Sequence, residues 1–167
     1  LAYNYDKGRI IAITGTNGKT TTTALVGQIV KAYNEQTYVV GNIGNSYTGE
    51  VLKTSENSYT VAEISSFQLE TVHRFHPVVS AILNITPDHL NRHHTMECYA
   101  HTKERIAENQ TKDDVCVLNM EDEELYRFGS ECKASVVWFS SKRKPDKGAY
   151  LDGDDIRYTD GTQDKLM

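Results

Sequence analysis

The short segment Gly15-Thr16-Asn17-Gly18-Lys19-Thr20 limits what this chain can fold into more than any other feature. It follows the apolar run 10–13 and precedes a helical pattern, which predicts a buried strand, a glycine turn and a helix. Backbone N–H groups at the start of such a helix point into open space, where phosphate binds. Lys19 can then reach the outer phosphates of a nucleotide, and the Thr20 hydroxyl can hold Mg²⁺.

One position departs from the general phosphate-loop pattern. That pattern has a glycine five residues before the Gly-Lys pair, where this chain has Ile13. The shorter form keeps every group with a chemical role, so we interpret it as a nucleotide-binding loop. The alternative is a glycine-rich turn with an incidental lysine. The predicted nucleotide-binding residues are Gly15, Thr16, Asn17, Gly18, Lys19, Thr20 and Thr21.

The composition argues against several classes of protein. The chain has 167 residues, enough for one domain with a substantial core, and its formal net charge of −5 argues against nucleic acid or a membrane surface as the main partner. No apolar segment approaches the roughly 20 residues that cross a bilayer. Cys98, Cys116 and Cys132 lack metal-ligand spacing, and Cys116 is expected to be a buried small hydrophobe. We therefore expect a soluble protein of the reducing cytoplasm.

Short apolar runs alternate with helical patterns along the chain, which is typical of an α/β fold with a mostly parallel sheet and flanking helices. The helix after the glycine loop carries Leu25, Ile29, Ala32 and Tyr33, and we expect this face to pack on the sheet. Further helical patterns cover residues 47–53, 96–108 and 121–128. The expected strands are residues 9–14, 37–40, 59–64, 78–85, 115–118 and 134–139.

The two ends of the chain differ from its middle in composition and in hydrophobic pattern. Residues 1–8 are polar and rich in tyrosine, and we expect them to be a linker from a missing N-terminal domain. Residues 9–167 are expected to form one domain, truncated before its C-terminal part. Within it, residues 141–148 predict a solvated basic loop, and residues 149–151 and 156–158 flank an Asp-Gly turn that predicts a small C-terminal β-hairpin.

Polar side chains follow the predicted strands at their carboxyl ends, where ligands bind in open parallel sheets. Asn42 follows the second strand, Glu63 ends the third, and Asn84, Asp88 and His89 follow the fourth. A carboxylate in the apolar run around Glu63 is costly unless it is paired or bound to a metal. With Thr20 and phosphate oxygens, Glu63 could complete the oxygen shell that Mg²⁺ prefers. The alternative is a glutamate that faces solvent at a strand end.

Histidines in loops are usually surface groups, and His89 is distinguished only by its position beside Asp88 and Asn84 at one strand end. We expect the following to be ordinary surface histidines: His73, His76, His93 and His94.

Lys103 lies on the apolar face of the predicted helix 96–108, since its neighbours three and four residues away are Tyr99, Ala100, Ile106 and Ala107. Burial there disfavours the ammonium form and makes the amine available for chemistry. The alternative is that the side-chain stem is buried while the ammonium group reaches water.

Four motifs in this order resemble the central ATP-binding domain of the Mur ligases. They are the glycine loop, Gly41-Asn42-Ile43-Gly44, the segment 63–69 and the segment 84–90, and together they span most of the chain. Within the family, the sequence Ser-Ser-Phe-Gln-Leu at 65–69 is most similar to the member that adds D-glutamate to UDP-N-acetylmuramoyl-L-alanine. Two departures are Asn91, where the family usually has aspartate, and His101, where a small residue is common.

The resemblance implies a role for each matching residue. Lys19 contacts the γ-phosphate of ATP, Thr20 and Glu63 hold one Mg²⁺, and His89 with a carbamylated Lys103 holds a second metal. It implies catalytic roles for Lys19, His89 and Lys103. The residues that line the muropeptide side are Asn42, Ser65 and Gln68.

The implied reaction is ATP-dependent formation of an acyl phosphate, which the amine of D-glutamate attacks to form an amide. We expect a monomer whose isolated central domain binds nucleotide weakly and makes no product. Rival readings are another amide ligase, such as folylpolyglutamate synthase or the ligase that adds the third residue of the peptide. Outside the ligases, the rivals are a phosphate-loop NTPase or kinase and a nucleotide-binding module without chemistry of its own.

Overall fold

The computed structural model describes residues 1–167 and contains one nine-stranded sheet in the order β2-β3-β1-β4-β5-β6-β7-β8-β9. The strands are β1 (Arg9–Thr14), β2 (Thr37–Gly41), β3 (Tyr59–Glu63), β4 (Val79–Ile82), β5 (Val115–Asn119), β6 (Ser135–Ser140), β7 (Gly148–Asp152), β8 (Asp155–Thr159) and β9 (Asp164–Leu166). The helices are α1 (Lys19–Tyr33), α2 (Tyr47–Glu50), α3 (Ser66–Leu69), α4 (Leu90–His93), α5 (Met96–Glu104) and α6 (Glu123–Glu131), with 3-10 turns η1 (Ala2–Tyr5), η2 (Val51–Lys53) and η3 (Arg105–Ala107).

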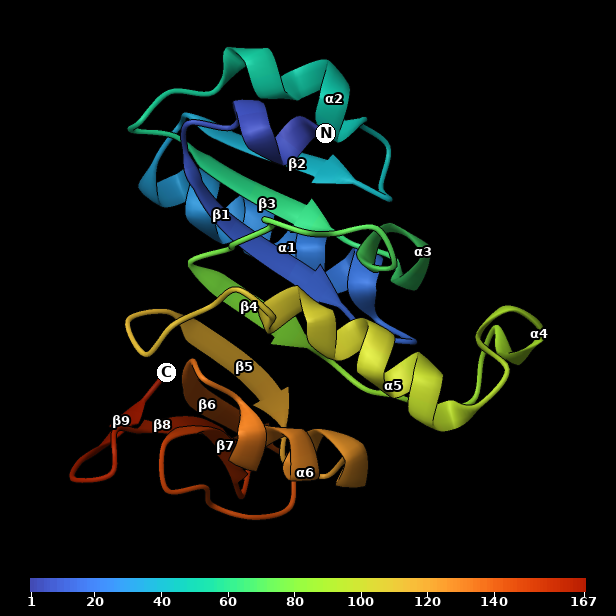
Figure 1. The fold of residues 1–167 in the computed structure, drawn as a ribbon. Coiled ribbons are helices and arrows are strands. Elements are labelled where there is room, and N and C mark those ends of the chain that lie inside the picture. Colours follow the sequence, from blue (N-terminus) through green and yellow to red (C-terminus); the bar gives the residue numbers. More distant parts are fainter.

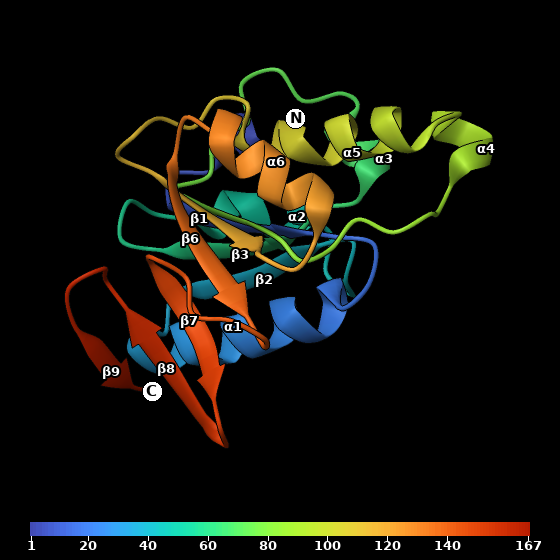
Figure 2. The ribbon, with the colours of Figure 1, turned by 90° about the horizontal axis from the view of Figure 1, so that it is seen from below.

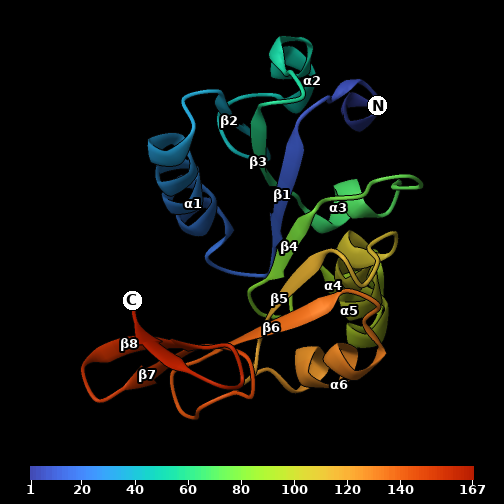
Figure 3. The ribbon, with the colours of Figure 1, turned by 90° about the vertical axis from the view of Figure 1, so that its left-hand side faces the viewer.

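The sheet is parallel from β2 to β7 and antiparallel from β7 to β9. This confirms the predicted α/β fold and the C-terminal hairpin. α1 lies on one face of the sheet, and α3, α5 and α6 lie on the other (Figure 3). Viewed along another axis, α4 projects from the body of the domain beyond α5 (Figures 1 and 2). The loops after β1 and β3, which both precede helices, open at the same edge of the sheet.

The main core lies between the sheet and the helices α3, α5 and α6. Alternate residues of the strands point into it, for example Ile10 and Ala12 of β1 and Cys116 and Leu118 of β5. The expectation that Cys116 is a buried small hydrophobe is confirmed. No helix combines the length and the apolar character that crossing a membrane requires.

The expected packing face of α1 was wrong. Leu25, Ile29 and Tyr33 are 56%, 61% and 81% exposed, and Ala32 is exposed as well. The residues that α1 buries are Thr23 and Gly27. Because residues two positions apart on a helix point in nearly opposite directions, the small residues face the sheet and the large apolar ones face away. At Gly27 the helix lies so close to Val39 that no side chain fits between them.

Other differences are local. The structure has a ninth strand, β9, and two one-turn helices, α3 and α4, that the sequence patterns did not predict. β4 is shorter than the expected strand 78–85, because the chain leaves the sheet after Ile82. Residues 2–5 form the turn η1, which packs Tyr3 edge-on against Phe75 with the ring centres 5.5 Å apart. The basic loop after β6 is largely exposed, as predicted.

The close approach of α1 to β2 predicts that Gly27→Ala destabilises the domain. An added methyl group overlaps the Val39 side chain, so we expect a loss of about 1–3 kcal/mol in the free energy of unfolding, measured by urea denaturation. Gly49→Ala is the matched control, because a Cβ there meets only Ser46 Cβ at 3.8 Å. Combining Gly27→Ala with Val39→Ala should cost less than the sum of the two single changes. Equal stability of Gly27→Ala and Gly49→Ala would contradict this packing.

Candidate phosphate and metal site

The glycine loop joins β1 to α1 at the carboxyl edge of the sheet. Gly18 precedes α1 with a φ of 81°, a left-handed conformation that favours glycine, and it leaves the first N–H groups of the helix open to solvent. Asn84 braces the loop from the segment after β4. Its side-chain oxygen accepts from Asn17 N–H at 2.8 Å, and its amide donates to the Asn17 carbonyl at 3.1 Å. The loop is therefore held open in a shape suited to phosphate.

Lys19 is folded back onto its own loop. Its Nζ donates to the carbonyl oxygens of Gly15 and Thr16 at 2.9 and 2.8 Å. The ammonium group of Lys19 thus donates to two neutral backbone oxygens. The charged oxygens of a phosphate would be stronger acceptors for it.

Glu63 is 1% exposed, so the alternative of a solvent-facing glutamate was wrong. Its two carboxylate oxygens accept from Thr20 Oγ1 at 2.9 Å and from Asn42 Nδ2 at 3.1 Å. The register explains the meeting, because Glu63 lies directly across from Ile13 of β1 and Gly41 of β2. The residue after β2 and the first turn of α1 thus supply the partners that a buried carboxylate needs.

The oxygen atoms of Glu63 and Thr20 suit a magnesium ion. Mg²⁺ is usually bound through one or two carboxylates together with phosphate oxygens and water, and here one carboxylate and one hydroxyl stand beside an open phosphate loop. No cluster of three or more histidine, cysteine, aspartate or glutamate side chains forms a closed metal cage anywhere in the structure. The residues Thr20 and Glu63 therefore fit a metal that is shared with a bound nucleotide.

Lys103 is 1% exposed, so the alternative that its ammonium group reaches water was wrong. Its Nζ donates to the carbonyl oxygen of Gly15 at 2.9 Å and lies 4.6 Å from the centre of the Tyr99 ring. Burial, reinforced by the charge of Lys19, lowers the pKa of Lys103 to about 7, while Asp88 opposes the shift. Lys19 and Lys103 donate to the same oxygen, so the two amines meet at the phosphate loop.

His89 is less closely integrated. Its side chain is 47% exposed, its Nε2 lies 3.4 Å from Asp88 Oδ2, and its ring packs against Phe67 with the ring centres 5.1 Å apart. No hydrogen bond or ion pair joins it to Thr20, Glu63 or Lys103. Hydrogen bonds thus link Glu63 to Thr20 and Lys103 to Gly15, whereas His89 stays at the solvent-exposed rim of the site.

Two of the four histidines assigned to the surface are not ordinary surface groups. His93 is buried, and its Nε2 lies 3.1 Å from Ser66 Oγ. His76 is half-buried and pairs with Asp114 at 2.7 Å. His73 and His94 are exposed as expected. Sequence reasoning missed His93 because α4 has no recognisable helical pattern, although its neighbour Tyr99 was correctly placed on a buried face.

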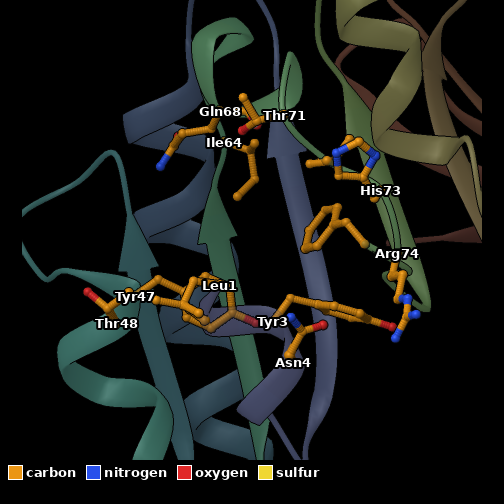
Figure 4. A pocket seen from close by; sticks show the side chains of 13 residues that line it. Leu1, Tyr3, Asn4, Tyr47, Thr48, Ile64, Gln68, Thr71, His73 and Arg74 are labelled. Atoms are coloured by element: carbon orange, nitrogen blue, oxygen red, sulfur yellow. The ribbon is translucent and has the colours of Figure 1, made fainter.

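Ser65 and Gln68 hold the turn α3 together. Ser65 Oγ accepts from Gln68 N–H at 3.3 Å, and the Gln68 side-chain oxygen accepts from Ser65 N–H at 2.8 Å, which is a capping box. Gln68 also borders a cavity of about 490 Å³ that none of the phosphate-loop residues lines (Figure 4). The cavity is lined by Leu1, Ala2, Tyr3, Asn4, Tyr47, Thr48, Ile64, Gln68, Thr71, Val72, His73, Arg74 and Phe75.

These features define a parallel α/β domain with a phosphate-loop motif at the edge where β1, β2 and β3 end. Residues 13–167 match the Mur ligase middle domain, and the chain belongs to that family.

Relatives and solved structures support this placement. The chain is 83% identical over its whole length to UDP-N-acetylmuramoylalanine--D-glutamate ligase of Lachnospira eligens and 56% identical to the same ligase of Lachnoclostridium phytofermentans. It spans 37% of the length of each of these relatives. A solved UDP-N-acetylmuramoyl-L-alanyl-D-glutamate--2,6-diaminopimelate ligase superposes with a TM-score of 0.72 at 22% identity, covering 95% of this chain and 38% of that one. MurF ligase of Thermotoga maritima, in complex with ADP, superposes with a TM-score of 0.70 at 17% identity, covering 99% of this chain and 41% of that one.

The buried amine of Lys103 predicts a pH dependence of stability. Its pKa of about 7 in the folded domain lies below the ordinary lysine value, so between these values the unfolded chain binds the extra proton. The free energy of unfolding should therefore rise from pH 7 to 9, by up to about 1.4 kcal/mol per pH unit, relative to Lys103→Met. Urea denaturation of both proteins in bicarbonate-free buffer measures this difference. Parallel pH curves for the two proteins would show that the native amine is not desolvated.

Proposed function

We propose that this chain is the ATP- and metal-binding part of an ATP-dependent ligase that joins D-glutamate to UDP-N-acetylmuramoyl-L-alanine. The relative at 83% identity, named for that reaction, supports the choice of substrates. The observation that carries the chemistry is the meeting of Lys19, Lys103 and the Thr20–Glu63 pair around one glycine loop. The reaction would transfer the γ-phosphoryl group of ATP to a carboxylate, giving an acyl phosphate and ADP. The amine of D-glutamate would then displace inorganic phosphate and lose a proton to form the amide.

The phosphate loop would bind and orient the triphosphate. Open N–H groups at the start of α1 face the phosphates, and Lys19 exchanges its two backbone carbonyls for the charged oxygens of the γ-phosphate. In phosphoryl transfer most of the catalysis is positioning and stabilisation of charge on the transferring oxygens. Thr20 and Glu63 would hold one Mg²⁺, which supplies part of that stabilisation when it is bound.

Lys103 is suited to carbamylation because its amine is buried and its pKa is lowered to about 7. The neutral amine adds carbon dioxide, forming an N–C bond and releasing one proton, and the product is a carboxylate-like group. Lys103 would then change from a donor to the Gly15 carbonyl into an oxygen ligand. Together with His89 it would hold a second metal. Asn42, Ser65 and Gln68 would contact the muropeptide substrate.

A phosphate-loop NTPase or kinase is the rival from another class. It would explain the loop and the Thr20–Glu63 pair, but it gives no role to a lysine buried beside the Gly15 carbonyl. We therefore favour the ligase. The monomeric state and the cytoplasmic location expected from the sequence stay predictions.

The acceptor requirement tests the proposal. The complete protein, given ATP, Mg²⁺ and UDP-N-acetylmuramoyl-L-alanine, should release ADP and form an amide only with D-glutamate among a panel that includes L-alanine and diaminopimelate. The same assay on the 167-residue chain should give no product, and calorimetry should show weak nucleotide binding. ADP release that is independent of any amino acid would support the NTPase, and turnover by the 167-residue chain would refute the assignment of a partial site.

The state of Lys103 gives a second test. Protein kept in bicarbonate should carry one added carboxyl group at Lys103, detected as extra electron density or by native mass spectrometry, and Lys103→Arg should lose both the modification and most of the ligase activity. Lys53→Arg, at an exposed lysine, is the control and should leave the activity unchanged. A bare amine at Lys103 in active, bicarbonate-treated enzyme would remove the second metal site from the proposal.

A further inference from the structure

The turn that carries His89 has little to hold it in place. α4 is a single turn of four residues that projects from the body of the domain beyond α5 (Figures 1 and 2). Residues with positive φ bound it on both sides, His89 at 50° and His94 at 67°. Residues other than glycine pay a conformational cost there, so surrounding contacts must maintain the geometry. The only residue that α4 buries is His93.

The His93 ring joins α4 to both neighbouring helices. It stacks on Phe67 of α3, with an interplanar angle of 11° and ring centres 5.8 Å apart, and it packs on Tyr99 of α5 at 5.1 Å. Its Nε2 lies 3.1 Å from Ser66 Oγ, and its Nδ1 lies 3.7 Å from Glu70 Oε1. Burial contributes most to lowering the pKa of His93, and the nearby charge of Glu70 opposes the shift.

Each element that His93 contacts carries a group of the candidate site. α3 begins three residues after Glu63 and contains Gln68. His89 directly precedes α4, and its ring packs on the same Phe67 that stacks on His93. On α5, the Tyr99 ring contacts both the His93 ring and the amine of Lys103. The Lys103 Nζ lies 4.6 Å from the centre of the Tyr99 ring.

We propose that His93 is a positioning residue, which holds the turn bearing His89 against α3 and α5 and thereby sets the place of His89 relative to Lys103. The inference rests on the proposed function for the roles of His89 and Lys103. No hydrogen bond or ion pair joins His93 to His89 or to Lys103, so it would act through the backbone of α4 and through the rings that it shares with them, Phe67 with His89 and Tyr99 with Lys103.

Kinetics of the complete ligase test this role. His93→Ala should lower kcat by about 10–100-fold and raise the Mg²⁺ concentration for half-maximal activity. The change in KM for ATP should be smaller, because His93 reaches the phosphate loop only through Tyr99, whose hydroxyl lies 3.2 Å from Thr16 Oγ1. His93→Gln, which can still reach Ser66, should recover part of the loss. His94→Asn is the control at the other end of the same turn, since the His94 side chain is exposed and makes no hydrogen bond or ion pair, and it should behave as the wild type.

A double-mutant cycle separates positioning from a general loss of stability. If His93 acts through His89, the variant carrying both His89→Ala and His93→Ala should be no slower than His89→Ala alone. Ser66→Ala, which leaves the ring in place, should show the same pattern as His93→Ala to a smaller degree. Additive losses in the cycle, or a kcat of His93→Ala equal to that of His94→Asn, would overturn the proposal.

Measurements without turnover distinguish this inference from the proposed function. Binding of Mn²⁺ in the presence of ADP, followed by electron paramagnetic resonance, should weaken in His93→Ala and stay unchanged in His94→Asn. Amide hydrogen exchange of residues 90–94 should accelerate only in the His93 variants. If the wild-type protein adds no D-glutamate, the proposed function fails while these two measurements still decide the role of His93. Unchanged Mn²⁺ binding and exchange would overturn it.

Discussion

The buried carboxylate of Glu63 is the constraint on which the candidate site depends. A charge taken out of water needs partners, and Glu63 finds them only because β3 pairs in parallel with both β1 and β2. That register sets Glu63 across from Ile13, which lies two residues before the glycine loop, and across from Gly41, which directly precedes Asn42. Gly41 has a φ of 108° and lies against the Glu63 backbone, so this crossing tolerates only glycine. Thr20 then closes the arrangement from the first turn of α1.

The second organising contact is the Gly15 carbonyl oxygen, which accepts from two amines. Two ammonium groups at one oxygen repel each other, and only one of them is buried beneath α5. The cost therefore falls on Lys103, whose pKa is lowered to about 7, while Lys19 faces the open loop. Two lysines within one hydrogen-bonded group thus differ in character: Lys103 loses its proton more readily, and Lys19 stays at the open loop. The difference comes from burial.

Much of this site could be predicted from the sequence because its signals are local. The glycine loop, the carboxylate in an apolar run and the lysine on an apolar helix face each depend on residues within about one helical turn or one strand. The failures were of two kinds. On α1, large apolar residues were taken for the packing face, but Thr23 and Gly27 face the sheet, and at Gly27 only glycine permits the approach to Val39. His93 was taken for a surface group, because its burial depends on Phe67 and Tyr99 from two other helices.

The sequence by itself determined the class of fold and the place of the glycine loop between a strand and a helix, since alternating apolar patterns and short-range spacing carry that information. It predicted buried positions for Glu63 and Lys103 but left solvent-exposed alternatives open, and the structure excluded these. Only the tertiary structure decided which groups meet: that Asn42 and Thr20 share Glu63, that Lys103 and Lys19 share the Gly15 oxygen, and that His89 stays at the rim. These contacts join residues up to 88 positions apart. Such meetings follow from strand order and register, which arise from packing the whole sheet at once and leave no mark in a local stretch of sequence.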